Sequence, residues 1–328
     1  MANNHEQFMD FYQSIVLTDG KKATLKKNRK ALRDRIRKYF KDNYPDEIIP
    51  KFKPQGSFAM KTLLNPLKDE DGLGVYDLDD GVYFIGDIKD RKSIPVYHQR
   101  IVDAVDGHTN NSPVDKNTCV RVEYSDGHHI DLPIYFKEDR SNTIPQLAHK
   151  SKGWIDSDPK EFWEWFNEKA NINPQLRRIV MYLKAWCDYK ESLNSQINMP
   201  GGCILTILAE KHFVRNNDRD DIALKEVLVK MYDGLNRNFA CLRPTTPKGE
   251  NLFNGYSQTR KEDFMSRLKS FKEDAERAVN TSNQKDACEK WQKHFGSRFS
   301  CSTAKDGDEN RAQQFSTPTI LRGDNKFA

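Results

Sequence analysis

Acidic residues interrupt an apolar run in the stretch "VYDLDDGVYF", residues 75–84. Carboxylates are poor strand formers, and burying them unpaired costs free energy. If this run is a strand, its side chains alternate between two faces, so Asp77 and Asp79 share one face while Leu78 and Val82 point the other way. Carboxylates two residues apart on a strand lie about 7 Å apart, which is close enough to hold divalent metal ions between them.

A second stretch, "HHIDLPIYF" at residues 128–136, repeats the same alternation. Asp131 lies opposite the apolar face to which Leu132 belongs. A third acid on a nearby strand would complete an all-oxygen site of the kind that Mg²⁺ prefers. Mutual repulsion among three clustered carboxylates would be severe without cations. Asp77, Asp79 and Asp131 are therefore candidates for a metal site suited to Mg²⁺.

Other polar residues beside these acids are interpreted differently. Asp80 breaks the alternation, and we interpret it as a structural turn acid beside Gly81. His128 and His129 could bind a metal ion, but histidines next to a hard oxygen site are more often neighbours than ligands. His129 shares the face of Asp131 and is placed to shape the site.

A Gly-Ser pair precedes the acids by about twenty residues, in "QGSF". Gly56 lets the backbone approach a phosphate closely, and the hydroxyl and amide of Ser57 can bind phosphate oxygens. Gln55, directly before the pair, is included in the predicted nucleotide site. A lone Gly-Ser is a weak signal. Its combination with two strands that carry acids is a strong one.

The elements around these motifs divide the chain into a mixed lobe and a helical lobe. Periodicity predicts helices at 5–18, 21–42 and 92–106, and strands at 55–58, 75–85, 118–124 and 128–136. From residue 157 onward helices dominate, at about 158–169, 174–192, 201–215, 221–238, 258–279 and 284–295. The resulting prediction is an α+β fold with a catalytic lobe at 1–156, a helical lobe at 157–300, a flexible tail at 301–328, and the active site in a cleft between the lobes.

Composition excludes several classes of protein. No apolar run approaches the ~18 residues of a membrane span, and the N-terminus does not resemble a signal peptide, so we expect a cytoplasmic protein. The six cysteines are scattered without zinc-site spacing and are interpreted as buried thiols, a disulfide framework being unlikely in that compartment. Residues 21–42 contain eleven Lys and Arg against two Asp. A solvated helix face is the favoured interpretation of this charge, ahead of a nucleic-acid patch.

The combination of motifs resembles the polymerase-β-type nucleotidyltransferases. Within that superfamily, "QGSF", "YDLDDGVYF" and "DGHHIDLPIY" resemble the cGAS/DncV-like nucleotidyltransferases, the bacterial cyclic-oligonucleotide synthases of CBASS anti-phage signalling. The resemblance implies a core with a long N-terminal spine helix, a metal-binding triad of Asp77, Asp79 and Asp131, and a triphosphate held by Gly56 and Ser57.

The resemblance also directs attention to the helix "LRRIVMYLKAWCDYK". Arg177 and Lys184 lie two turns apart on it, and in related enzymes a lysine on the corresponding helix reaches the triphosphate. Lys184 is therefore favoured, with a surface lysine as the alternative. Gly202, in the following "MPGGCILTILA", could meet phosphate through free amides at a helix start, although close helix packing is the favoured interpretation.

The implied activity is the joining of NTPs, ATP or GTP or both, into a cyclic di- or trinucleotide with release of pyrophosphate. The alternative is a template-independent or oligoadenylate-synthetase-like polymerase that makes linear products and is activated by RNA. The implied partners are an effector that reads the product and an E1/E2-like ligase that acts on the C-terminus. No membrane partner is expected, and a nucleic-acid partner is disfavoured.

Overall fold

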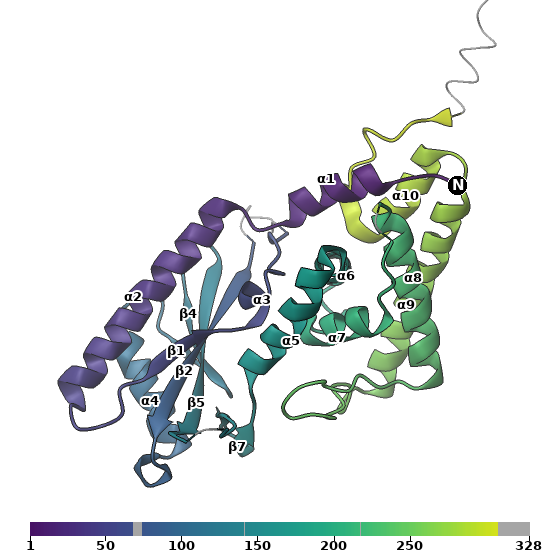
Figure 1. Ribbon diagram of the computed structural model, residues 1–328. Helices are drawn as coiled ribbons and strands as arrows, with labels where there is room; N and C mark the ends of the chain where they lie inside the picture. The colour runs from purple at the N-terminus through teal and green to yellow at the C-terminus, as the bar shows by residue number, and fades with distance from the viewer. Residues whose placement is uncertain (68–73, 141, 217, 308–328) are drawn as a thin grey trace, which may run out of the picture.

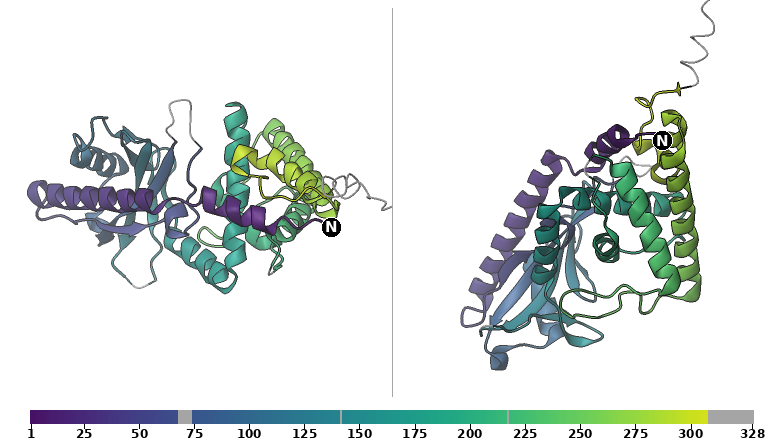
Figure 2. Two further views of the ribbon diagram at one scale, coloured as in Figure 1. Left: turned by 90° about the horizontal axis from the view of Figure 1, so that it is seen from above. Right: turned by 45° about the vertical axis from the view of Figure 1, so that its right-hand side comes forward.

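The structure, a computed structural model, describes residues 1–67, 74–140, 142–216 and 218–307. A mixed sheet with helices on its outer face forms one half of the molecule, and a bundle of helices forms the other (Figure 1). Figure 2 shows the two halves at opposite ends of an elongated molecule. The predicted α+β fold with a helical lobe is confirmed.

Among the described residues the sheet has seven strands, and its central pair carries the acids. Five strands run in the order β1-β2-β5-β4-β3, and β6 pairs with both β5 and β7. β2 and β5 are parallel, and every other pairing is antiparallel. The strands are β1 (Lys51–Pro54), β2 (Tyr76–Gly86), β3 (Val114–Asp115), β4 (Cys119–Glu123), β5 (His128–Glu138), β6 (Gln146–His149) and β7 (Gly153–Asp156).

The long helix α2 (Asp19–Asn43) and α4 (Ile94–Val105) cover one face of this sheet (Figure 1). α2 begins after Thr18, whose side chain accepts a hydrogen bond from the amide of Lys21. The apolar stripe of α2 is buried against the apolar side chains of β2 and β5. Because strand side chains alternate, this packing leaves the acids on the opposite face, toward the helical half.

Two sequence predictions about short elements were wrong. Residues 55–58 were predicted as a strand, but the structure places β1 just before them and a single helical turn, α3 (Gly56–Ala59), in their place. Gly56 has φ +65°, a conformation that ends an extended strand and is readily adopted only by glycine. The short strands β3, β6 and β7 were not predicted.

The helical half is close to its prediction. It consists of α5 (Pro159–Ile172), α6 (Pro174–Leu193), α7 (Gly202–His212), α8 (Asp220–Arg237), α9 (Gln258–Asn280) and α10 (Gln284–Phe295). α6 is largely buried at its centre, where Trp186 and Tyr182 are fully enclosed. Within the described residues, every helix is too short or too polar to cross a membrane.

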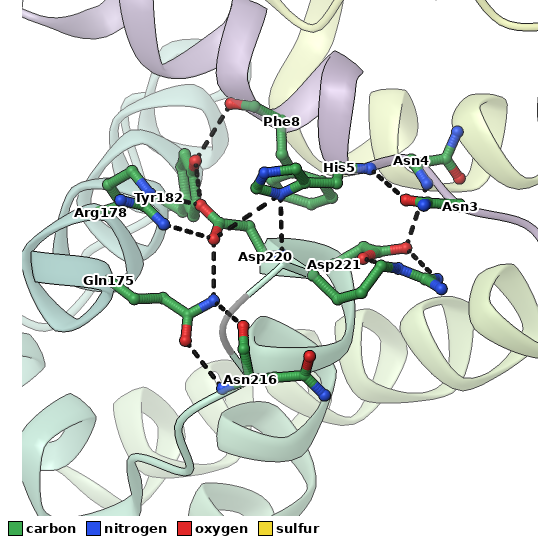
Figure 3. Close-up of polar contacts among 11 residues, drawn as sticks. Asn3, Asn4, His5, Phe8, Gln175, Arg178, Tyr182, Asn216, Asp220 and Asp221 are labelled. Carbon is green, nitrogen blue, oxygen red and sulfur yellow. Dashed lines mark hydrogen bonds and ion pairs between the residues drawn. The ribbon is translucent and has the colours of Figure 1, made fainter. Parts of the chain in front are cut away.

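The first helix, α1 (His5–Ile15), packs on the helical half although it opens the chain. Figure 3 shows the polar contacts that hold it there. The amide of Asp220 donates to His5, and the Asp220 carboxylate is bound by Arg178 at 2.6 and 2.8 Å. The Tyr182 hydroxyl lies 2.8 Å from the same carboxylate and 3.0 Å from the carbonyl of Phe8. The predicted domain boundary after residue 156 stays a prediction, but α1 contributes to the helical core.

The segment that follows α10 folds back onto the same core. Cys288 and Cys301 are joined by a disulfide, which corrects the expectation of separate thiols, while Cys119, Cys187, Cys203 and Cys241 are free. The Thr303 hydroxyl accepts a hydrogen bond from Gln7. Residues 301–307 are therefore packed rather than part of a flexible tail, and the remainder of that predicted tail lies outside the described residues.

Candidate active site

The three predicted acids lie side by side on the central strands. Asp79 on β2 is the direct register partner of Asp131 on β5, and Asp77 is the partner of His129. Directly paired residues on neighbouring strands project from the same face with their Cβ atoms about 5 Å apart. The strand pairing thus brings together the acids that the sequence separates by more than fifty residues.

Electrostatic repulsion is concentrated on Asp79. Burial, together with the neighbouring charges of Asp77 and Asp131, raises the pKa of Asp79 to about 7. Within the described part of the chain, no side-chain hydrogen bond or ion pair is made by Asp77 or Asp79. Two partly buried carboxylates without partners form an oxygen donor set that fits a hard divalent cation.

Asp131 differs from the other two acids, because Arg121 on β4 binds both of its carboxylate oxygens. The two N–O distances are 2.7 and 2.8 Å. Among the described residues, no group of three or more His, Cys, Asp or Glu side chains is arranged to hold a metal ion. The structure therefore brings the predicted triad together but leaves only Asp77 and Asp79 open to an ion in this conformation.

Asp80 and His128, which were not predicted to bind the metal ion, have structural contacts instead. Asp80 is fully buried and binds Arg33 of α2 through both oxygens. The hydrogen bonds of the buried Asp80 carboxylate are therefore made by Arg33 and not by the backbone of a turn. His128 contacts Asp126 and Asn28 through its two ring nitrogens, so neither nitrogen is available to an ion at Asp77 and Asp79.

The Gly-Ser turn lies directly against the acids. A Cβ atom on Gly56 would come within 2.0 Å of an Asp79 carboxylate oxygen, so only glycine fits between the turn and the acid. Gln55 is buried and donates to the Tyr135 hydroxyl at 3.3 Å, while its Oε1 has no partner among the described residues. Gln55, Gly56 and Ser57 all line a cavity of about 400 Å³ that also contains Asp77 and Asp79.

The helical half supplies the opposite wall of this cavity. Lys184 of α6 and Gly202 at the start of α7 both line it, and a Cβ on Gly202 would lie 3.3 Å from Lys184 Cε. Lys184 donates to the carbonyl of Thr62 at 2.8 Å, and burial lowers its pKa. Arg177, the alternative on the same helix, instead donates to the carbonyl of Met60 at 3.1 Å and is not among the residues lining this cavity.

Two further charged residues of the cavity were not identified from the sequence. Asp158, the N-cap of α5, and Arg243, on the loop after α8, both line it. Arg243 opens the segment "RPTTPKGENLF", residues 243–253. Within it Glu250 holds Arg243 at 2.8 Å, and the amide of Thr246 donates to Glu161 of α5. Only the folded loop reveals that its arginine reaches the cavity.

An acid pair that faces a glycine turn, on a mixed sheet beside a helical lobe, is the arrangement that the sequence resemblance implied. Residues 50–135 match the family model described as "Cyclic GMP-AMP synthase DncV-like, nucleotidyltransferase domain". Residues 50–135 are therefore similar to a DncV-like nucleotidyltransferase domain, which confirms the resemblance found in the sequence.

Curated relatives and solved structures agree with this family. A cyclic GMP-AMP synthase of Escherichia albertii is 30% identical over 209 residues, covering 60% of this chain and 44% of that protein. A cyclic GMP-AMP synthase of Vibrio cholerae is 24% identical over 315 residues, covering 78% of this chain and 70% of that protein. The chain thus spans less than half of the E. albertii protein in that alignment.

The fold of the whole chain has close structural counterparts. The crystal structure of Vibrio cholerae DncV cyclic AMP-GMP synthase with nonhydrolyzable GTP superposes with a TM-score of 0.77 at 22% identity, covering 92% of this chain and 97% of that one. The same synthase with the linear intermediate 5′ pppA(3′,5′)pG gives 0.73 at 22% identity, covering 91% and 96%. These matches establish the fold that positions the cavity.

Proposed function

We propose that this chain is a metal-dependent nucleotidyltransferase that joins ATP and GTP into a cyclic dinucleotide and releases pyrophosphate. The observation that supports this most directly is a single cavity that contains unpartnered acids, a glycine turn and a lysine. The relatives named above as cyclic GMP-AMP synthases, and the intermediate bound to one of them, support a two-nucleotide product.

The residues divide the proposed reaction between them. The amides and hydroxyl of the Gly56–Ser57 turn would bind phosphate oxygens, and Lys184 would neutralise their charge. Asp77 and Asp79 would hold Mg²⁺ or Mn²⁺. Such ions, when bound, supply charge neutralisation at the phosphates. We assign Asp131 to the attacking ribose hydroxyl, whose proton its carboxylate would take.

A cyclic product requires the same cavity to act twice. The second round needs the linear product to turn so that its free hydroxyl faces its own triphosphate. The two-sided cavity supports this, because its walls come from different halves of the molecule and carry charges on both sides. Asp158 and Arg243 are candidates for contacts with the bases or sugars.

We also propose a biological setting, which is taken from the family that this chain resembles. We infer a bacterial cytoplasmic enzyme of anti-phage signalling, whose product is read by an effector protein. An E1/E2-like ligase acting on the C-terminus is a further proposed partner, and its target residues lie outside the described chain.

The test is incubation of the purified protein with labelled ATP, GTP, CTP and UTP and either Mg²⁺ or Mn²⁺. A phosphatase-resistant product with the mass of a cyclic dinucleotide is expected, and it should be absent for an Asp77→Ala/Asp79→Ala control of matched melting temperature. Linear ladders alone would favour the oligonucleotide polymerase. Nucleotide binding without any turnover, with or without added RNA, would contradict both enzymatic functions.

A further inference from the structure

Three charged side chains form a row across the middle of the sheet. Asp131 on β5 is the register partner of Asp79 on β2 and also of Arg121 on β4. Directly paired residues project from the same face. The backbone register itself, rather than a chance side-chain rotamer, therefore places Arg121 beside the third acid of the site.

From that position Arg121 binds both carboxylate oxygens of Asp131. Its Nε and Nη2 atoms donate to the two carboxylate oxygens at 2.7 and 2.8 Å. The pair is well enclosed, with side-chain exposures of 21% for Arg121 and 12% for Asp131. A fork that binds both oxygens of a carboxylate is strong and leaves little room for a metal ion on the same side.

We infer that Arg121 is a positioning residue that keeps Asp131 away from the metal site until a nucleotide phosphate takes the guanidinium in its place. This inference rests on the proposed function. A guanidinium matches phosphate and carboxylate with the same two-pronged geometry, so exchange between them conserves its hydrogen bonds. Arg121 remains charged throughout, and no covalent bond changes.

The contrast with the neighbouring acids supports this inference. Asp77 and Asp79 have no guanidinium or ammonium partner among the described residues, so only they are open in the free protein. The complete three-acid site would then form only when the acceptor nucleotide is in place. Without the acceptor nucleotide the three-acid site would be incomplete, so attack of water on a bound NTP would be slow and hydrolysis of that NTP would be suppressed.

The test measures Mn²⁺ binding to the full chain by electron paramagnetic resonance, without nucleotide, in wild-type protein and R121Q. Release of Asp131 should tighten Mn²⁺ binding by about tenfold or more, because a third carboxylate becomes available to the ion. R121K should lie between the two, because an ammonium cannot hold both oxygens. Arg140→Gln, at an exposed arginine paired with Glu138, should leave Mn²⁺ binding unchanged.

A second pair of measurements keeps the test decisive. If R121Q is unstable, the double variant R121Q/D131N removes the unpaired acid, and it should regain stability without gaining Mn²⁺ affinity. Adding a nonhydrolysable NTP analogue should tighten Mn²⁺ binding much more in wild type than in R121Q. Equal Mn²⁺ affinity of wild type and R121Q without nucleotide would overturn the inference while leaving the proposed reaction intact. Absence of any product from wild type would overturn the reaction, even if Mn²⁺ binding behaved as inferred.

Discussion

Asp79 is where the geometry of the site has its largest electrostatic effect. Burial and the charges of Asp77 and Asp131 raise its pKa from 3.8 to about 7. A carboxyl group whose folded-state pKa is raised stabilises the fold at low pH, and that contribution is lost as the pH rises through the folded value. The free energy of unfolding of the metal-free protein should therefore fall as the pH rises from about 4 to about 7.

Asp79→Asn removes this cost, because the amide stays neutral. In EDTA at pH 8, the free energy of unfolding of the variant should exceed that of wild type by on the order of 2 kcal/mol, a figure reduced for solvent screening. The variant should therefore have the higher melting temperature. The difference should be smaller at pH 5. Saturating Mn²⁺ should reverse the order at pH 8, since only the wild-type site keeps both acids. Melting curves at the two pH values check this, and an equal gap at both would contradict it.

Gly56 tests the contact between the turn and the acid. A Cβ there would lie 2.0 Å from an Asp79 oxygen, and φ of +65° is unfavourable for alanine. Gly56→Ala should displace the turn and reduce turnover by about 100-fold, the cost of a shift of roughly 1 Å in a reacting geometry. Gly20→Ala is the control, since nothing lies within 4 Å of its Cβ position. Equal activities of the two variants would refute the contact.

Lys184 tests the helical wall of the cavity. Lys184→Ala should weaken binding of a nonhydrolysable NTP by roughly 10- to 100-fold, the value of one charge-assisted hydrogen bond. Lys190 lies on the same helix and donates to the carbonyl of Lys293, away from the cavity, so Lys190→Ala should bind nucleotide normally. Calorimetric titration measures the affinity of both variants for the NTP. Unchanged affinity of Lys184→Ala would show that Lys184 does not bind the nucleotide.

Among the elements, long periodic segments were predictable and short ones were not. The start of α6 at Pro174 and the bounds of α10 follow from periodicity and capping residues. β3 and β6 contain only two and four residues, too few for an alternating pattern to stand out. The turn at residues 56–59 depends on a positive φ that no periodicity encodes.

The candidate site was predictable for the same physical reason. Asp77 and Asp79 could be assigned to one face of their strand, and Asp131 to the polar face of its own strand, because alternation along a strand is a local property. Arg121 and Arg243 could not be assigned, because their positions depend on the register of β4 against β5 and on a folded loop. The disulfide of Cys301 was missed because it depends on the reversal of the chain after α10.

This disulfide should be measurable as a redox-dependent gain in stability. Closing a loop of 13 residues stabilises a fold by about 3 kcal/mol. Under oxidising conditions Cys301→Ser should therefore melt below wild type. With dithiothreitol the two proteins should converge, since both then lack the bond. Failure of dithiothreitol to lower the melting temperature of wild type would indicate that the thiols are not paired in solution.

At the scale of the whole molecule, the buried Asp220 fastens α1 to the helical half (Figure 3). Burial alone would raise the pKa of Asp220, but hydrogen bonds from Arg178 and Gln175 outweigh it and lower the pKa below 3.8. A depressed carboxyl pKa stabilises the fold above its unfolded value, and this contribution is lost as the pH falls. The attachment of α1 should weaken in acid.

Asp220→Asn should reveal this attachment at neutral pH. Loss of one partner leaves Arg178 buried without a counter-charge, at a cost of about 3 kcal/mol. Asp10→Asn, at an exposed position of α1, is the control. Hydrogen exchange should show α1 exposed more readily in Asp220→Asn than in Asp10→Asn. Equal protection of α1 would contradict the fastening role.

The position of α1 has a consequence for how the protein is made. Phe8 and Phe11 of α1 pack on Phe295 and Phe299, at the far end of the described chain. A ribosome releases α1 before those partners, and domains tend to fold as they emerge. The sheet half has its own core and can form early, whereas the contacts of α1 with Phe295 and Phe299 can form only after nearly all of the helical half has been synthesised. Until then, the apolar face of α1 is a segment of the nascent chain that needs protection from aggregation.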